Sequence, residues 1–444
     1  MGACRSAAGR EFRRAGSRHL DLEKAAAPLA WLSTDGKKLL VTRVLRTFAY
    51  GYLAVVIALY LSELGLDTIQ VGIVLSAAIF GSALMTVLWA LVADRYGRRR
   101  TVATMAVFMI AGGLLFAFGS SFPLLLLGAF TGTISATSSE VGAFLTVEQA
   151  ILPQTAPPER RTWLFSIYAF VANIAQAVGS LFAGVVAAFA ALGLAGADAY
   201  RPLFVLYALV GVLNLAIFLS LSDRVEATRV EGERRFVGVH RSVGTVARLG
   251  ALFGVDAFAG GLVVQSLVAY WFFIRWGLDP GQLGVLFFFV NLVSGVSLLA
   301  AGWLAGRIGL INTMVFTHLP SNLLLVLVPL MPTAELAAAA FLARMSISQM
   351  DVPTRQSYTM AVVDPDERTA AAGLTNVARS TASALSPTVT GWAFSVAALS
   401  LPFFIAGGLK IAYDLLLFTA FRNLRPPEEA ALAAPLDSRG TPLP

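Results

Sequence analysis

The stretch ALVADRYGRRRT, residues 90–101, places five charged side chains between two long apolar segments. The charged residues are Asp94, Arg95 and the three arginines of positions 98–100, and Gly97 between them allows the backbone to turn sharply. Such charges can be hydrated only where the hydrocarbon ends, so a short charged turn between apolar segments is typical of a loop that joins two membrane-spanning helices. The stretch therefore predicts a helical hairpin in a membrane.

The overall composition also indicates a membrane protein. Of the 444 residues, 57% are hydrophobic and 13% are charged, and the mean hydropathy is +0.74. Soluble domains carry about 25% charged residues. The single cysteine, Cys4, excludes an intramolecular disulfide, and His19, His240 and His318 do not have metal-binding spacing. We expect no metal and no cofactor.

Twelve apolar spans follow the basic N-terminal segment. At 1.5 Å per residue, each span is long enough to cross about 30 Å of hydrocarbon as a helix. The spans are 40–61, 69–93, 102–119, 122–147, 163–190, 202–221, 245–274, 282–305, 313–331, 334–362, 370–397 and 402–421.

The distribution of basic residues predicts the orientation. An even number of spans places both termini on one side of the membrane. If that side is the cytoplasm, two of the 33 Lys and Arg residues, Arg201 and Arg275, fall outside, three lie within spans, and the rest are cytoplasmic. We therefore expect an integral protein of the inner (plasma) membrane with cytoplasmic termini. Its positive charge faces anionic lipids, not nucleic acid.

The chain contains an internal repeat. Residues 65–72 (GLDTIQVG) recur as 277–284 (GLDPGQLG) at an offset of 212, and Gln149 and Arg161 recur as Gln356 and Arg368 at an offset of 207. The repeat predicts an all-α fold in which two six-helix bundles are related by a pseudo-twofold axis along the membrane normal. The expected domains are a tail (1–39), a bundle (40–222), a central loop (223–244), a second bundle (245–422) and a tail (423–444). Asp67 and Asp279 are expected to be helix N-caps.

Residues 90–101 resemble the loop 2–3 motif of the major facilitator superfamily, G-x-x-x-D-R-x-G-R-R. The matching residues are Asp94, Arg95, Gly97, Arg98 and Arg99, whereas Ala90 stands at the first glycine. The resemblance covers about 40–421 and implies a secondary transporter that works by alternating access. It also implies a solute site between the halves at mid-membrane, lined mainly by spans 1, 4, 7 and 10. In that scheme Asp94 caps the cytoplasmic end of span 11 when the protein is open to the outside.

A second resemblance concerns span 5. Residues 175–184 (AQAVGSLFAG) partly match G-x-x-x-G-P-x-x-G-G of bacterial-type proton-coupled drug antiporters. Gly179 and Gly184 match, and Ser180 stands where that pattern has proline. Small residues at this spacing are also common at close helix crossings.

Ionisable residues within spans are functional candidates by default. Glu140, Asp256 and Asp351 lie about 12–17 Å from the cytoplasmic helix ends and are the candidates for proton coupling, Glu140 being the first choice. Asp351 is expected to pair with Arg379 at similar depth. Lys410 and Asp414, four residues apart on peripheral span 12, are expected to pair with each other and to have no transport role.

A further set of residues is expected to line a solute cavity. Arg344 has no acidic partner within reach on its own span, which leaves it able to bind an anionic group. The cavity candidates are Arg344, Arg379, Gln265, Asn291, Asn376, Tyr50 and Phe258. The repeat also suggests two alternating gates: Glu63 with Arg275 on the outside and Glu148 with Arg355 on the inside, each hydrated when open.

Three function classes remain open. The first is a secondary active transporter that moves a small organic solute, with proton-coupled efflux by antiport favoured. The second is proton-coupled uptake, or facilitated transport, of an organic anion. The third is a non-transporting receptor or scaffold on the same fold. No enzyme is expected, because the sequence lacks a nucleotide-binding G-x-x-x-x-G-K-[ST] loop and a nucleophile–base pattern. The expected partners are a solute, protons and the lipid bilayer, with the chain as a monomer.

Overall fold

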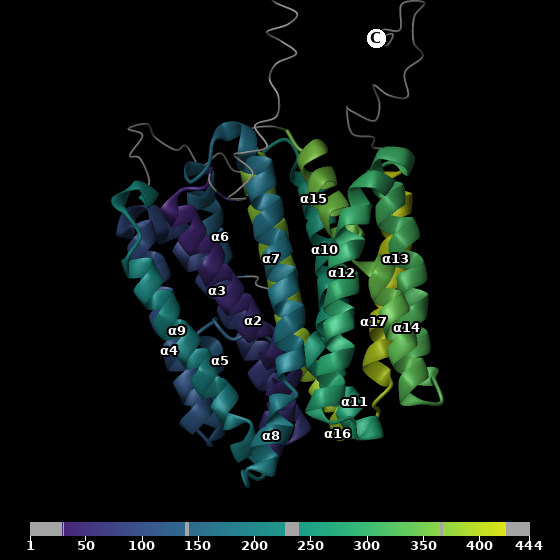
Figure 1. Ribbon diagram of the computed structural model, residues 1–444. Coiled ribbons are helices and arrows are strands. Elements are labelled where there is room, and N and C mark those ends of the chain that lie inside the picture. The colour runs from purple at the N-terminus through teal and green to yellow at the C-terminus, as the bar shows by residue number, and fades with distance from the viewer. Residues whose placement is uncertain (1–28, 30, 138–141, 227–238, 365–366, 423–444) are drawn as a thin grey trace, which may run out of the picture.

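The computed structural model describes residues 29, 31–137, 142–226, 239–364 and 367–422, and within these ranges the regular structure is helical (Figure 1). The helices of the first bundle are α2 (Thr34–Glu63), α3 (Thr68–Tyr96), α4 (Arg98–Phe118), α5 (Phe122–Phe130), α6 (Ala143–Ile151), α7 (Arg161–Phe182), α8 (Val185–Ala191) and α9 (Arg201–Leu219). Those of the second bundle are α10 (Val243–Leu262), α11 (Gln265–Trp276), α12 (Pro280–Ile308), α13 (Leu310–Leu327), α14 (Ala334–Ser348), α15 (Asp351–Ala361), α16 (Arg368–Ser395) and α17 (Leu401–Phe421).

These helices form the twelve predicted spans. By length and composition, nine helical stretches in the described part of the chain are apolar enough to cross a membrane. The other three spans are α5 with α6, α14 with α15, and α16. Span 4 is interrupted between α5 and α6, span 7 at positions 263–264, and span 10 at positions 349–350. Three of the four spans expected to face the solute, 4, 7 and 10, are therefore interrupted near their middle.

The two repeat motifs form the same local structure. At the start of α3, Asp67 Oδ1 accepts a hydrogen bond from the Gln70 backbone N–H at 2.8 Å. At the start of α12, Asp279 Oδ1 accepts from the Gln282 N–H at 3.0 Å. In both cases the Gln side chain accepts from the Asp backbone N–H, which completes a capping box. The predicted N-caps are confirmed.

The two bundles are joined on one side of the molecule. Helix α2 begins and α17 ends at the top of Figure 1, which we call the terminal side; the opposite side is the far side. Near the far side, Thr68 Oγ1 of α3 donates to the Gly391 carbonyl of α16 at 2.9 Å. On the other seam, Gln176 Nε2 of α7 donates to Asn291 Oδ1 of α12 at 2.9 Å, and Asn291 Nδ2 donates to Ser180 Oγ at 3.0 Å. The far side is therefore closed.

Glycines allow this closure and the packing within each bundle. A Cβ at Gly391 would lie 2.2 Å from the Thr68 carbonyl oxygen across the bundle interface. Within the first bundle, a Cβ at Gly179 of α7 would lie 2.0 Å from the Phe48 carbonyl oxygen of α2. Close helix packing thus accounts for Gly179, one of the two glycines that span 5 shares with the antiporter pattern.

Substituting Gly391 by valine should open the far side. The added atoms cannot fit beside the Thr68 carbonyl, so the α3–α16 contact must separate. In a Cys4→Ser background with Ser76→Cys as reporter, we expect a maleimide to label purified protein several-fold faster when Gly391 is replaced. Gly408→Val on α17 is the control, because a Cβ there meets nothing within 4 Å. Equal labelling rates for the two variants would contradict the prediction.

The charged loop of residues 90–101 is a tight turn. Gly97 has φ +104°, a conformation that favours glycine, and it separates α3 from α4. Asp94 Oδ1 lies 3.0 Å from Arg98 Nε, and Glu226 accepts from the backbone N–H groups of Arg98 and Arg99 at 2.6 and 3.3 Å. These contacts join the first bundle to the start of the central loop and do not reach the second bundle. The capping of α16 by Asp94 concerns the opposite conformation and stays a prediction.

On the same side, Glu367 ties the start of α16 to the segment before α10. Its carboxylate accepts from the backbone N–H groups of His240 at 2.7 Å, Arg241 at 2.6 Å and Ser242 at 2.9 Å. Burial alone would raise the pKa of Glu367, but these hydrogen bonds outweigh it and lower that pKa to about 2.

Because the pKa of Glu367 is lowered, the contact between Glu367 and the segment before α10 should weaken in acid. The stabilisation is complete above the pKa of an unfolded glutamate, about 4.3, and is lost as the pH falls towards 2. Between pH 5 and 3, the melting temperature of wild-type protein in detergent should therefore fall more steeply than that of Glu367→Gln. Glu159→Gln, at an exposed position, is the control and should keep the wild-type slope. A Glu367→Gln slope equal to that of wild type would argue against the tie.

Candidate functional site

A cavity of about 780 Å³ lies between the two bundles. Helix α3 lines it from Ala78 to Trp89, that is, from just beyond the far-side contacts towards the terminal side. Helix α16 lines it from Asn376 to Ser383, again on the terminal side of the Ser76–Thr388 contact. The closed far side and this position of the cavity define a conformation whose solute space faces the terminal side.

Six of the seven residues predicted to line a solute cavity lie in the wall of this cavity. The residues that line the cavity are Tyr50, Gln265, Asn291, Arg344, Asn376 and Arg379. Phe258 is the exception, because it packs against the apolar core instead. It follows Asp256 by two positions on α10, which turns it about 200° away from the side that Asp256 presents to the cavity. Glu140, the first choice for proton coupling, lies outside the described residues.

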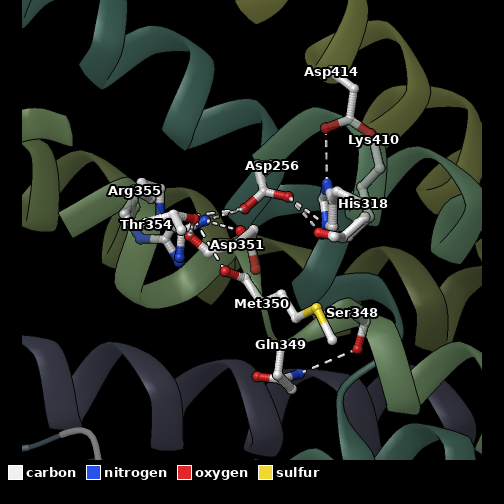
Figure 2. A network of polar contacts seen from close by, with 12 residues as sticks. Asp256, His318, Ser348, Gln349, Met350, Asp351, Thr354, Arg355, Lys410 and Asp414 are labelled. Carbon is white, nitrogen blue, oxygen red and sulfur yellow. Dashed lines mark hydrogen bonds and ion pairs between the residues drawn. The ribbon is translucent and has the colours of Figure 1, made fainter. Parts of the chain in front are cut away.

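Asp256 is the centre of a buried ionic network (Figure 2). Its carboxylate lies 2.5 Å from Lys410 Nζ, 3.1 Å from Arg355 Nη1 and 3.4 Å from Arg379 Nη1. Asp351 joins through Arg355, at 2.8 Å. Helices α10, α15, α16 and α17 each contribute a charged side chain to this network.

Two predicted pairs are wrong. Asp351 pairs with Arg355, one helical turn away, and not with Arg379, which pairs with Asp256. Lys410 does not pair with Asp414, because its long side chain crosses to Asp256. Lys410 therefore lines the cavity although span 12 was expected to be peripheral and without a transport role.

His318 of α13 was missed as a functional residue. Its Nδ1 lies 2.8 Å from Asp414 Oδ1, and its Nε2 lies 3.9 Å from Asp256 Oδ1 (Figure 2). Asn322 Nδ2 donates to Asp414 Oδ2 at 2.9 Å. The signal in the sequence is a single histidine within an apolar span, whose spacing from the other histidines speaks against a metal site but not against another role.

The first bundle also contains a buried ion pair. Its acidic and basic residues have exchanged places relative to the pair Asp256–Arg355 of the second bundle. Glu148 of α6 lies 2.8 Å from Arg46 Nη2 of α2, and both side chains are fully buried. Glu148 also accepts from the Tyr168 hydroxyl at 2.5 Å and from Thr42 Oγ1 at 3.3 Å. Glu148 and Arg355 occupy equivalent positions of the repeat but have opposite charges. Glu148 pairs with Arg46 of span 1, and Arg355 pairs with Asp256 of span 7.

The gate hypotheses need correction. With the terminal side open, Glu148 and Arg355 are apart, but Glu148 is buried and paired instead of hydrated. On the closed far side, Glu63 and Arg275 form no ion pair among the described residues, and the Arg275 guanidinium lies 5.0 Å from the Trp276 ring centre. The far side is closed by helix packing and neutral hydrogen bonds. The meeting of Glu148 with Arg355 in another conformation stays a prediction.

Arg344 is the most distinctive cation of the cavity. Its side chain is 8% exposed, and its Nε is buried without a hydrogen-bond partner. Nη1 lies 3.1 Å from the Met345 sulfur, and no carboxylate pairs with Arg344 among the described residues. The described lining thus carries four cations, Arg344, Arg355, Arg379 and Lys410, against the carboxylates of Asp256 and Asp351.

Two six-helix bundles around a charged central cavity define a membrane transporter architecture. Residues 39–387 match the model of the Major Facilitator Superfamily, and the chain belongs to this family. The protein is therefore a transporter of some solute and not an enzyme.

Related proteins agree with this assignment. The chain is 27% identical over 423 residues to the uncharacterized membrane protein YJR124C of Saccharomyces cerevisiae, covering 88% of this chain and 94% of that protein. Its fold resembles the nucleoside transporter NupG, with a TM-score of 0.68, 12% identity, and coverage of 88% and 99% of the two chains. It also resembles the human organic anion transporter MFSD10, with a TM-score of 0.59, 15% identity, and coverage of 86% and 98%.

Proposed function

We propose that the protein transports a small organic anion by alternating access, coupled to protons. The observation that carries the proposal is Arg344, a buried guanidinium in the cavity with no carboxylate partner among the described residues. A guanidinium buried without a partner is costly, and an anion that binds it with two parallel hydrogen bonds removes that cost. The organic anion transporter MFSD10 shows that this fold can serve such a solute.

The remaining lining suits a solute of modest size. A volume of about 780 Å³ lies within the range of pockets that enclose small organic molecules. The amides of Gln265, Asn291 and Asn376 supply neutral hydrogen-bonding groups, and Tyr50 supplies an aromatic surface. These groups orient a solute whose negative charge lies at Arg344.

Arg379 connects the solute to the ionic network. Its contact with Asp256, at 3.4 Å, is the longest of the three that Asp256 makes with lysine and arginine, and its side chain is 28% exposed. An anion in the cavity therefore competes with Asp256 for Arg379. Glu140, Asp256 and Asp351 remain candidates for proton coupling, but Asp256 and Asp351 are held in ion pairs in this conformation.

The proposed orientation follows from the positive charge of the loops. The terminal side is cytoplasmic, and the conformation described is the inward-open state. The protein acts as a monomer in the plasma membrane. Coupling of an anion to proton entry favours uptake over efflux.

Flux into proteoliposomes that contain the full chain tests the proposal. We would compare p-toluenesulfonate and succinate with choline and glucose, at equal pH and with an imposed pH gradient. The sulfonate stays ionised at every pH used, so it neither carries protons itself nor crosses lipid as a neutral acid. We expect protein-dependent flux of the anions, increased when the compartment that supplies the anion is the more acidic. Flux of choline or glucose but of neither anion would overturn the proposal; protein-free liposomes are the control.

A further inference from the structure

We propose that His318 binds the transported proton on Nε2, and that the resulting imidazolium displaces Arg379 from Asp256 so that Arg379 can bind the anion. The inference rests on the proposed anion transport. It assigns the proton to a histidine of span 9, which is not one of the four spans expected to line the cavity, and not to one of the carboxylates near the cavity centre.

The position of His318 allows a proton to reach it. The ring is 3% exposed, yet it forms part of the cavity wall together with Asp256 and Lys410. Figure 2 shows the ring between Asp414 on one side and Asp256 on the other. A proton from water in the cavity therefore reaches the ring without passing through the apolar core.

The hydrogen bonds define which nitrogen is available. Two groups lie near His318 Nδ1: Asp414 Oδ1 at 2.8 Å and Asn322 Nδ2 at 3.3 Å. The shorter contact is with a carboxylate that offers only acceptors when ionised, so we assign the hydrogen of this contact to Nδ1. Asn322 Nδ2 donates to the other oxygen of Asp414 at 2.9 Å, which fixes the carboxylate. In the neutral ring, Nε2 therefore has a lone pair directed towards Asp256 Oδ1. The distance of 3.9 Å is too long for a hydrogen bond, as expected when a lone pair faces a carboxylate oxygen.

Charged groups on four neighbouring helices surround His318. Helix α10 contributes Asp256, and α17 contributes Lys410, Asp414 and the Tyr413 ring at 6.1 Å. Helices α14 and α15, which also pack against α13, contribute Arg344, Asp351 and Arg355. Of these groups, the two carboxylates Asp256 and Asp414 are within 4 Å of the ring nitrogens. An imidazolium would donate to Asp414 through Nδ1 and to Asp256 through Nε2.

Protonation changes the competition for Asp256. Lys410 pairs with Oδ1 of this carboxylate, whereas Arg355 and Arg379 pair with Oδ2. An imidazolium that donates to Oδ1 becomes a fourth cation, so each cation then shares less of the negative charge of the carboxylate. Arg379 has the longest contact and the most exposed side chain of the three, so it is the one released into the cavity. The proton forms one N–H bond on Nε2 and breaks none within the protein. One proton with one monovalent anion therefore leaves the charge of the loaded site unchanged, which is anion–proton symport.

The first test measures protonation without any solute. The chain has three histidines, so ring-labelled histidine in the full-length protein gives few NMR signals. His318→Gln assigns the His318 signal, and His240→Gln, in the segment held by Glu367, is the matched control. We expect the His318 signal to change in one step from the Nδ1–H neutral form to the imidazolium when the pH is lowered from 9 to 4.5. A ring that keeps one form from pH 4.5 to 9, or a neutral form protonated on Nε2, overturns the proposal.

The second test measures coupling in proteoliposomes with p-toluenesulfonate or succinate. We expect His318→Gln to retain the exchange of labelled for unlabelled anion. The accumulation of anion driven by a pH gradient should be at least about tenfold lower in His318→Gln than in wild type. His240→Gln should behave as wild type. Unchanged accumulation by His318→Gln, or loss of exchange together with accumulation, overturns the role of His318. If wild-type protein transports neither anion, the proposed function fails, whereas the NMR titration still decides whether His318 binds a proton.

Discussion

Glu148→Gln should lower the free energy of unfolding by about 3–5 kcal/mol, because it leaves the Arg46 guanidinium charged and buried without its carboxylate. The two side chains lie 2.8 Å apart, and neither is exposed. The Tyr168 hydroxyl and Thr42 Oγ1 also donate hydrogen bonds to Glu148. Because the pair is fully buried, no solvent can hydrate the Arg46 guanidinium when the carboxylate is removed. The melting temperature in detergent and the yield of monodisperse protein measure the effect.

A surface pair provides the matched control. Arg99 and Asp223 are 3.0 Å apart, but their side chains are 36% and 89% exposed, so Asp223→Asn should cost no more than about 1 kcal/mol. Reversing both charges, Arg46→Glu with Glu148→Arg, should recover part of the loss of the single variants. If Glu148→Gln melts no lower than Asp223→Asn, Arg46 is stabilised by something other than this pair.

The sequence predicted the features that depend on local patterns. Apolar length fixed the spans, and the Asp-x-x-Gln spacing fixed the N-caps at Asp67 and Asp279, since a capping box needs only residues within one helical turn. The repeat offset placed Glu148 and Arg355 at equivalent positions. It did not show that Arg46 and Asp256 would lie beside them, because these pairs join residues 102 and 99 positions apart.

The wrong pairs have a common cause. Lys410 and Asp414 have the i, i+4 spacing that favours a pair on an isolated helix, but such a pair contributes only about 0.2–0.5 kcal/mol. Buried Asp256, 154 residues from Lys410, needs counter-charges far more, so Lys410 turns towards it and Asp414 pairs with His318. Tertiary burial, which a single sequence does not show, decides which of several possible partners a buried charge takes.

Arg344→Gln should abolish anion transport while leaving the fold intact. Arg344 has no carboxylate partner among the described residues, so its removal leaves no acidic group unpaired, in contrast to Glu148→Gln. Instead, the variant loses affinity for the solute, because the cavity then lacks the guanidinium that binds the negative charge of the solute. Truncating one member of a buried charge pair costs about 2–5 kcal/mol, which corresponds to an affinity at least about 30-fold lower for p-toluenesulfonate or succinate.

One further variant separates the charge of Arg344 from its shape, and a second variant is a control at an exposed arginine. Arg344→Lys keeps the charge but cannot make two parallel hydrogen bonds, so it should retain part of the affinity. Arg307→Gln, at an exposed position of α12 where the guanidinium lies 4.1 Å from the Trp303 ring centre, should transport as wild type does. Anion flux by Arg344→Gln at the wild-type rate and affinity would remove Arg344 from the site. Without solute, Arg344 is a buried charge with no carboxylate partner among the described residues, so Arg344→Gln should also raise the melting temperature of the solute-free protein. Added anion should raise the melting temperature only of protein that contains Arg344.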